Sequence, residues 1–245
     1  MQNIVAVIEA RMSSTRLPGK VLAEVEGRPM LELMIERVRR VPSLDGIVIA
    51  TTENDADQPI VDFAERLGVG CWRGSEDDVM RRVLDAATAY DADVIVELTG
   101  DCPVIDPAII ETTIAAFQAA DVVYAANDLE QTWPIGMNVE VFTTAALKDA
   151  ERRTSDAEER EHVSPYIYRN PERYPQINVA APPDETRPGL RLTLDTPEDL
   201  IVLCAIFEAL GTDPADFSLR DVLVFLDANP QIAAVNANVV HRYVV

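Results

Sequence analysis

The chain has 245 residues, of which 42 are acidic and 21 are basic, so its formal net charge at pH 7 is -21. Such a charge argues against nucleic-acid polymers and anionic membranes as partners, because both would repel the protein. The apolar fraction of 48% is typical of a globular chain, and no apolar run approaches the roughly 20 residues that span a bilayer.

The cysteine pattern and the N-terminus predict a cytoplasmic protein. Cys71, Cys102 and Cys204 lie far apart and form neither a metal-binding spacing nor a disulfide framework. The first residues lack a basic segment before their apolar run, so we expect no signal peptide. Lys20 and Lys148 are the only lysines, which together with the acidic excess indicates a halophilic source, although a GC-rich genome would also deplete lysine.

In the first half of the chain, apolar runs of strand length alternate with helical periodicity. Met30, Met34, Val38 and Val41, for example, share one helical face. We predict strands at 3–10, 46–52, 69–74 and 93–105, the last running into a loop, and helices at 29–41, 59–68, 77–90 and 107–120. Strands and helices that alternate with short connections predict a mostly parallel sheet with helices on both faces.

The second half is more irregular and richer in proline, which suits an active-site lid or a dimer-forming insertion. Here we predict strands at 121–127, 137–142, 176–183 and 190–196, helices at 144–153, 196–210 and 218–230, and mixed structure at 162–174. No internal repeat or linker is visible. We therefore predict a single α/β domain over residues 1–245.

Ligands of open α/β sheets bind beyond the carboxyl ends of the strands. The loops to consider are therefore 9–20, 51–58, 72–78, 99–106 and 195–199.

The loop after the first predicted strand gathers positive charge in an acidic chain. Residues 10–22 contain no carboxylate, and Gly19 is their first glycine, so they match neither the dinucleotide-binding nor the Walker phosphate loop. The cations and hydroxyls of this cationic loop are Arg11, Ser13, Ser14, Thr15, Arg16 and Lys20. Such a set can spread over several phosphates, and a solvated basic turn is the alternative.

Two aspartates lie where the predicted strands end. Asp101 lies in a Gly-Asp-Cys-Pro turn after 93–99, and Asp195 ends the strand predicted at 190–196. Taken alone, Asp101 is explained by a local turn, and Asp195 or Thr196 by an N-cap with Pro197 in the first turn. Two carboxylates facing the cationic loop instead predict Mg²⁺ bound between them and the phosphates of a nucleotide.

Five segments resemble the cytidylyltransferase family, and most closely its spore-coat-polysaccharide-biosynthesis branch. CMP-KDO and CMP-sialic acid synthetases are more distant relatives in this comparison. The segments are EARMSSTRLPGKVL (9–22), RGSEDDVMRRV (73–83), ELTGDCPVIDP (97–107), EHVSPYIY (161–168) and RLTLDTPEDL (191–200).

The resemblance implies a GT-A-like nucleotidyltransferase fold and assigns roles to residues of these segments. It places the CTP phosphates on Ala10, Arg11, Arg16 and Lys20, and a metal ion on Asp101 and Asp195. It also implies a homodimer formed through the irregular second half. One departure is Cys102, where CMP-KDO synthetases typically carry glutamate, so their sugar specificity does not transfer to this chain.

Further candidates lie outside the cationic loop. Arg73 resembles a family residue that borders the nucleotide pocket, while Asp77 and Asp78 are as easily explained as acids at a helix start. Trp133, Asn138 and Glu140 are predicted sugar contacts. Packing is the alternative for Trp133, and a solvated strand face is the alternative for Glu140. His162 has no role that we can derive, and we expect His241 to be structural.

We therefore predict an Mg²⁺-dependent enzyme that transfers CMP from CTP to a sugar or sugar acid and releases pyrophosphate. Arg11, Lys20 and Asp101 would act directly on the reacting groups, and Ser13, Ser14, Arg16 and Arg73 would help bind the nucleotide.

One alternative is a GT-A glycosyltransferase with a D-x-D metal site, since DAD occurs at 55–57 and 91–93. However, Asp91 and Asp93 precede their strand, and we expect Asp55 and Asp57 to cap the helix that Pro59 begins. The other alternative is a non-catalytic CTP-binding subunit.

Overall fold

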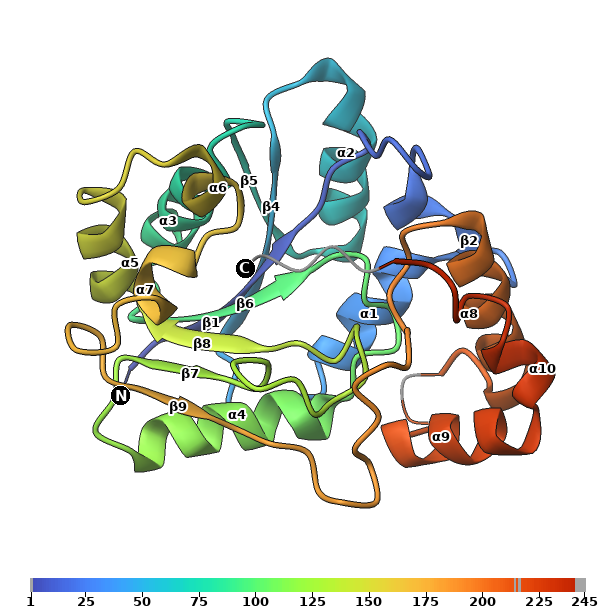
Figure 1. The fold of residues 1–245 in the computed structure, drawn as a ribbon. Helices are drawn as coiled ribbons and strands as arrows, with labels where there is room; N and C mark the ends of the chain where they lie inside the picture. The colour runs from blue at the N-terminus through green and yellow to red at the C-terminus, as the bar shows by residue number, and fades with distance from the viewer. Residues whose placement is uncertain (1, 214, 216, 241–245) are drawn as a thin grey trace.

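The computed structural model describes residues 2–213, 215 and 217–240 (Figure 1). His241 lies outside the described residues. The centre is a seven-stranded sheet in the order β5-β4-β1-β6-β8-β7-β9. Its strands are β1 (Ile4–Glu9), β4 (Gly46–Thr52), β5 (Gly70–Gly74), β6 (Val94–Thr99), β7 (Tyr124–Ala126), β8 (Glu140–Thr143) and β9 (Gln176–Asn178).

Strand β8 runs antiparallel to both of its neighbours, while every other pairing in this sheet is parallel. The prediction of a mostly parallel sheet is thus confirmed. A separate hairpin joins β2 (Glu24–Val25) to β3 (Arg28–Pro29). Because β8 is reversed, its first residue lies at the sheet edge where β6 ends, which adds its side chains to the edge that carries the site.

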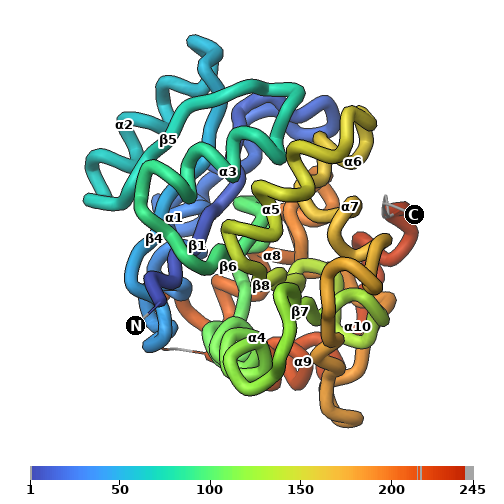
Figure 2. Tube along the Cα trace, turned by 90° about the vertical axis from the view of Figure 1, so that its left-hand side faces the viewer, coloured from blue at the N-terminus to red at the C-terminus, as the bar shows by residue number. Residues whose placement is uncertain are grey.

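The apolar side chains of β1 alternate between two cores, as a strand with both faces buried requires. Ile4, Ala6 and Ile8 join one core, and Val5 and Val7 join the other. The first core includes α1 (Met30–Val38), α2 (Gln58–Leu67) and α4 (Pro107–Ala119). The second includes α3 (Val79–Ala89), α5 (Thr144–Glu151) and α7 (Pro165–Tyr168), with α3 and α5 side by side in Figure 2.

The remaining helices extend these layers. Figure 1 shows α8, α9 and α10 gathered on one side of the sheet, beyond α1. Their bounds are α8 (Pro197–Leu210), α9 (Leu219–Ala228) and α10 (Pro230–Ala233), and α6 (Ala157–Glu161) lies near α3. No helix in the described part of the chain is long and apolar enough to cross a bilayer. The assignment of all 245 residues to one domain stays a prediction.

The strand predicted at 190–196 is wrong. This segment makes one isolated bridge, between Ile135 and Arg191, and is otherwise irregular. Its N–H groups bond to different segments: Leu192 donates to the Ile135 carbonyl and Leu194 to the Asp101 carbonyl, both at 2.7 Å. Hydrophobic alternation alone could not distinguish a strand from an extended segment that is held between two loops.

The start of α8 confirms the predicted N-cap followed by a proline. Thr196 is the N-cap and Pro197 is the first helical residue. The Thr196 hydroxyl accepts from the Asp199 N–H, and the Asp199 carboxylate accepts from the Thr196 N–H, which completes a capping box. This cap holds Asp195, the residue just before it, in a defined position.

Candidate active site

The site lies at the carboxyl edge of the sheet, where the loops after β1 and β6 touch. The Gly100 N–H donates to the Glu9 carbonyl at 2.8 Å. A Cβ atom at Gly100 would lie 2.7 Å from that oxygen, so a larger residue would force the two loops apart. This close approach brings Asp101 against the cationic loop.

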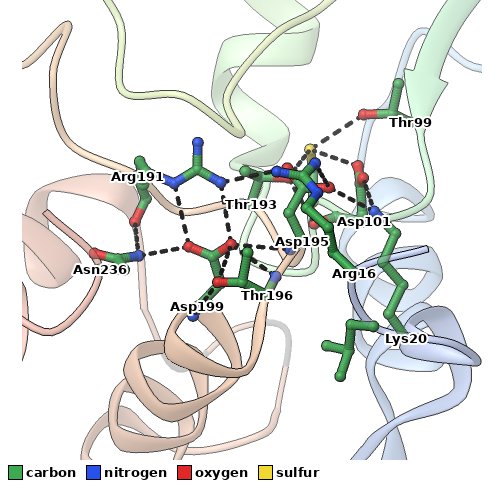
Figure 3. Close-up of polar contacts among 12 residues, drawn as sticks. Arg16, Lys20, Thr99, Asp101, Arg191, Thr193, Asp195, Thr196, Asp199 and Asn236 are labelled. Carbon is green, nitrogen blue, oxygen red and sulfur yellow. Dashed lines mark hydrogen bonds and ion pairs between the residues drawn. The ribbon is translucent and has the colours of Figure 1, made fainter. Parts of the chain in front are cut away.

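Lys20 binds both of the aspartates that the sequence singles out. Its Nζ atom lies 2.5 Å from Asp101 Oδ2 and 2.8 Å from Asp195 Oδ1 (Figure 3). The Arg16 guanidinium lies 2.9 Å from the same Asp195 oxygen. Residues from three distant parts of the chain therefore meet around one cation, which is the arrangement expected if a ligand bridges the cationic loop and the two carboxylates.

We call the contact of Lys20 with Asp101 and Asp195 the junction. Within it, Lys20 and Asp195 stabilise each other's ionised form. Burial works to lower the pKa of Lys20, but the attraction of Asp101 and Asp195 outweighs it and raises that pKa above its usual value. Burial likewise works to raise the pKa of Asp195, yet Lys20, Arg16 and Arg191 lower it. The ammonium and the carboxylate of this pair are therefore both ionised at neutral pH.

A buried ion pair between Arg191 and Asp199 holds Asp195 in place through hydrogen bonds. Arg191 is 3% exposed and Asp199 is fully buried, and the guanidinium binds both Asp199 oxygens at 3.2 and 3.0 Å. Asp199 also accepts from the Asp195 N–H at 3.0 Å and from Asn236 at 2.9 Å (Figure 3). Sequence reasoning missed Arg191 and Asn236, because only folding brings them to Asp199. The capping-box spacing after Thr196 was a signal for Asp199 itself.

Asp57 anchors the cationic loop instead of capping α2, so our expectation of a helix cap there is wrong. No side-chain cap bond forms at the start of α2. The Asp57 carboxylate is buried, accepts from the Met12 N–H at 2.6 Å, and also accepts from the Thr52 hydroxyl. The partly buried N–H of Met12 gains this acceptor, whereas the exposed start of α2 can bond to water.

We expect Asp57→Ala to destabilise the protein by about 1–3 kcal/mol, because it leaves the Met12 N–H without its partner. The measurement is urea unfolding followed by circular dichroism. Asp55→Ala, at an exposed position in the short 3₁₀ helix Asp55–Asp57, is the control and should change stability little. Equal stability of the two variants would contradict the anchoring role.

The remaining predicted nucleotide contacts divide into two groups. Ser13 and Arg11 both contact Glu76, the serine through a 2.7 Å hydrogen bond and the arginine at 3.6 Å. Arg73 does not reach the site: its guanidinium binds the carbonyls of Thr52 and Asn54, and so holds the loop after β4. Its contact with a nucleotide stays a prediction.

Two adjoining cavities open at the junction. The smaller, of about 300 Å³, is lined by the cationic loop, by the buried Arg82 and by Asp101 and Asp195. The members of the cationic loop that line it are Ala10, Arg11, Ser13, Ser14, Thr15, Arg16 and Lys20. The larger, of about 570 Å³, shares Arg11, Arg16, Asp101 and Asp195 with the first and continues along the ends of β6 and β8. Glu9 and Glu161 also line the smaller cavity, so its cations and carboxylates are balanced, whereas carboxylates predominate in the larger one.

Two of the three predicted sugar contacts line a cavity and the third does not. Asn138 and Glu140 line the larger cavity. Trp133 is buried and does not line it; its indole N–H donates to the Val179 carbonyl at 2.8 Å, which supports the packing alternative. His162, whose role the sequence left open, lies exposed on the rim of both cavities.

Next to His162 the backbone is strained. Val163 has a φ of +65°, an unfavourable conformation for a β-branched residue, and the Ser164 N–H donates to the His162 carbonyl across it at 2.8 Å. Strain of this kind persists where the surrounding structure imposes it, often at functional sites. Nothing in the sequence indicated it.

Several known proteins have sequences related to this chain. The cytidylyltransferase family model matches residues 5–217. The chain is 36% identical to an uncharacterized protein of Methanocaldococcus jannaschii over 96% of this chain and 95% of that protein. It is 34% identical to the spore coat polysaccharide biosynthesis protein SpsF of Bacillus subtilis over 95% of this chain and 98% of that one.

Solved structures agree in fold. A cytidylyltransferase from Leptospira borgpetersenii superposes with a TM-score of 0.89 at 32% identity, over 99% of this chain and 100% of that one. A CMP-KDO synthetase complexed with CTP gives a TM-score of 0.64 at 20% identity over 84% and 99% of the two chains, which shows the fold alone. The family match over most of the chain and these full-length relatives place the protein in the cytidylyltransferase family.

Proposed function

We propose that this protein transfers CMP from CTP to a sugar or sugar acid and releases pyrophosphate. The observation that carries the proposal is the junction of Lys20 with Asp101 and Asp195, placed between the two cavities. The cationic loop that lines the smaller cavity suits a triphosphate, and the larger cavity leaves room for an acceptor. SpsF, by its name, serves polysaccharide biosynthesis, which supports an acceptor of the sugar class.

In this proposal the cations of the loop bind and orient the triphosphate. Arg11, Arg16 and Lys20 line the smaller cavity and would offset the charge that develops on the departing pyrophosphate. The acceptor oxygen would attack from the larger cavity, so that the two substrates meet at the junction and react through their placement.

The carboxylates at the junction fit a magnesium ion. Lys20 Nζ reaches both Asp101 and Asp195, so the two side chains can share one cation. Mg²⁺ commonly binds through one or two carboxylates and completes its shell with substrate phosphates and water. Bound there, Mg²⁺ would neutralise phosphate charge.

A Lys20→Met variant should lower kcat/KM for CTP by about 10²–10³-fold, because it removes the one ammonium group that contacts both aspartates. The matched control is Lys148→Met, which removes the only other lysine, at an exposed position on α5. Pyrophosphate release is the measurement. Equal rates for the two variants would contradict the role of Lys20.

The test of the function itself is a pyrophosphate-release screen of each nucleoside triphosphate against acidic and amino sugars, at high and low salt. We expect release with CTP in the presence of at least one sugar. Parallel incubations with nucleotide sugars test the glycosyltransferase alternative, which would release a nucleoside diphosphate and no pyrophosphate. CTP binding with no pyrophosphate from any acceptor would indicate a non-catalytic subunit.

Within the DAD segment at 55–57, Asp57 is occupied by the loop backbone, which disfavours a D-x-D metal site there. The homodimer, the cytoplasmic location and the halophilic source stay predictions. The two salt conditions of the screen address the last of these, because a halophilic enzyme should be more active at high salt.

A further inference from the structure

The larger cavity has a wall of carboxylates for which the proposed chemistry assigns no role beyond a sugar contact at Glu140. Glu9 ends β1, Glu97 lies near the end of β6, and Glu140 begins β8. Asp128 follows β7, so four neighbouring strands each bring one carboxylate to the same edge of the sheet. All four line the cavity of about 570 Å³, and we call them the acidic wall.

The acidic wall lowers the stability of the sheet. Glu97 and Glu140 are paired residues of β6 and β8, so their side chains stand on the same face, directly opposite one another. Two negative charges in this arrangement would destabilise the sheet, so the pair favours keeping a proton until a cation binds. Burial raises the pKa of Glu97, Asp128 and Glu140, the last to about 8.

The wall also lacks cationic partners. No ion pair joins Glu97, Asp128 or Glu140 to a basic side chain in the part of the chain that the structure describes. Glu9 alone has a nearby guanidinium, that of Arg82 at 3.9 Å. The arginines that line this cavity are Arg11 and Arg16, which belong to the cationic loop.

Two buried acceptor atoms on the wall have no hydrogen-bond donor. Glu140 Oε2 and Asn138 Oδ1 are each inaccessible to solvent and without a partner, although the hydroxyls of Tyr124 and Ser164 lie close to the Glu140 carboxyl group. The Asn138 amide nitrogen donates to Asp128 at 2.7 Å, which orients its oxygen. Buried acceptors without partners are expensive, so the wall is complementary to a group that brings N–H donors.

A metal ion is a poorer match than an organic cation. No group of three or more potential ligand residues in the described residues has the geometry to hold one. The carboxylates instead project from adjacent strands, which lie about 4.8 Å apart. An ammonium group with three N–H donors on a sugar ring can reach carboxylates spaced in this way.

We propose that the acidic wall binds a protonated amine of the acceptor, which makes the acceptor an amine-bearing sugar. This inference rests on the proposed function. The amine lies against Glu97 and Glu140, and the reacting oxygen points to Asp101. An N-acetylated sugar is excluded from the wall, because its amide offers one N–H and no charge to several carboxyl groups.

The first test measures binding without turnover. Hexoses that carry an amine at position 2, 4 or 6 are titrated by calorimetry into the protein, each beside its N-acetylated form. At least one amine should bind about ten-fold more tightly than its N-acetylated form. If none of the pairs shows this preference, the inference fails.

The second test uses Glu140→Gln, with Glu172→Gln at an exposed position as the matched control. Glu140→Gln should reduce the preference for the amine to less than about three-fold, while the affinity for CTP, titrated separately, stays unchanged. Glu97→Gln serves as a second variant of the wall, and thermal unfolding shows that each variant is folded. An undiminished preference in both folded wall variants overturns the inference.

The two proposals fail in different ways. Amine binding that depends on Glu140, with no pyrophosphate formed from any acceptor, defeats the proposed function and keeps the amine site. Pyrophosphate formed with N-acetylated or acidic sugars, and no amine preference, keeps the function and defeats the amine site.

Discussion

Asp101→Asn is expected to lower pyrophosphate release from CTP by about 10³-fold or more while leaving the fold intact. The substitution removes one of the two negative charges that meet at Lys20 and replaces an anionic carboxylate ligand for a divalent ion with a weaker neutral amide. The main-chain carbonyl of Asp101, which accepts from the Leu194 N–H, is unaffected, so Asp195 should keep its place. The measurement is steady-state kinetics with CTP, together with circular dichroism.

The control for this prediction is Asp55→Asn. Asp55 is exposed, lies at the same edge of the sheet, and belongs to the DAD segment that a glycosyltransferase would use. Its substitution should leave the rate unchanged. Retained activity in Asp101→Asn, or a comparable loss in Asp55→Asn, would remove the basis for placing the metal ion at Asp101.

The second large effect is on stability. Burial and the charge of Asp128 raise the pKa of Glu140 from 4.5 to about 8. Between these two values the unfolded chain has released this proton and the folded chain retains it. The free energy of unfolding should therefore fall by about 1.4 kcal/mol for each pH unit across this window, and level off above pH 8.

Glu140→Gln should remove this slope, so the variant gains stability over the native chain as the pH rises from 5 to 8. Other ionisable side chains surround Glu140, so the slope is obtained by comparing the variant with the native chain at the same salt concentration. These groups are Glu9, Glu97, Tyr124, Asp128, His162 and Tyr168. Urea unfolding at several pH values measures the difference, with Glu172→Gln as control. A difference that does not change with pH would show that Glu140 ionises normally.

Asp57 and Arg73 carry charge at the predicted edge of the sheet, and the sequence made them candidates for a helix cap and a nucleotide contact. In the structure each bonds to backbone groups of a neighbouring loop, which overturns the cap at Asp57 and leaves the nucleotide contact of Arg73 a prediction. A sequence shows that a side chain can bond, but the nearest buried donor or acceptor decides which bond forms.

The sequence by itself determined the parallel sheet and the parts of the site that lie in short motifs. Apolar runs and helical periodicity are local, so they could be read directly, and the cationic loop stood out against a chain of net charge -21. Asp101 and Asp195 were recognisable because each follows an extended apolar segment.

Only the tertiary structure decided how those parts meet. Leu192 and Leu194 bond to two different loops, and this carries Asp195 to Lys20. The reversed β8 pairs Glu140 with Glu97 and so creates the acidic wall. Strand order, register and loop contacts join residues far apart in the chain, and their free energy depends on the packing of the whole sheet, which no local pattern contains.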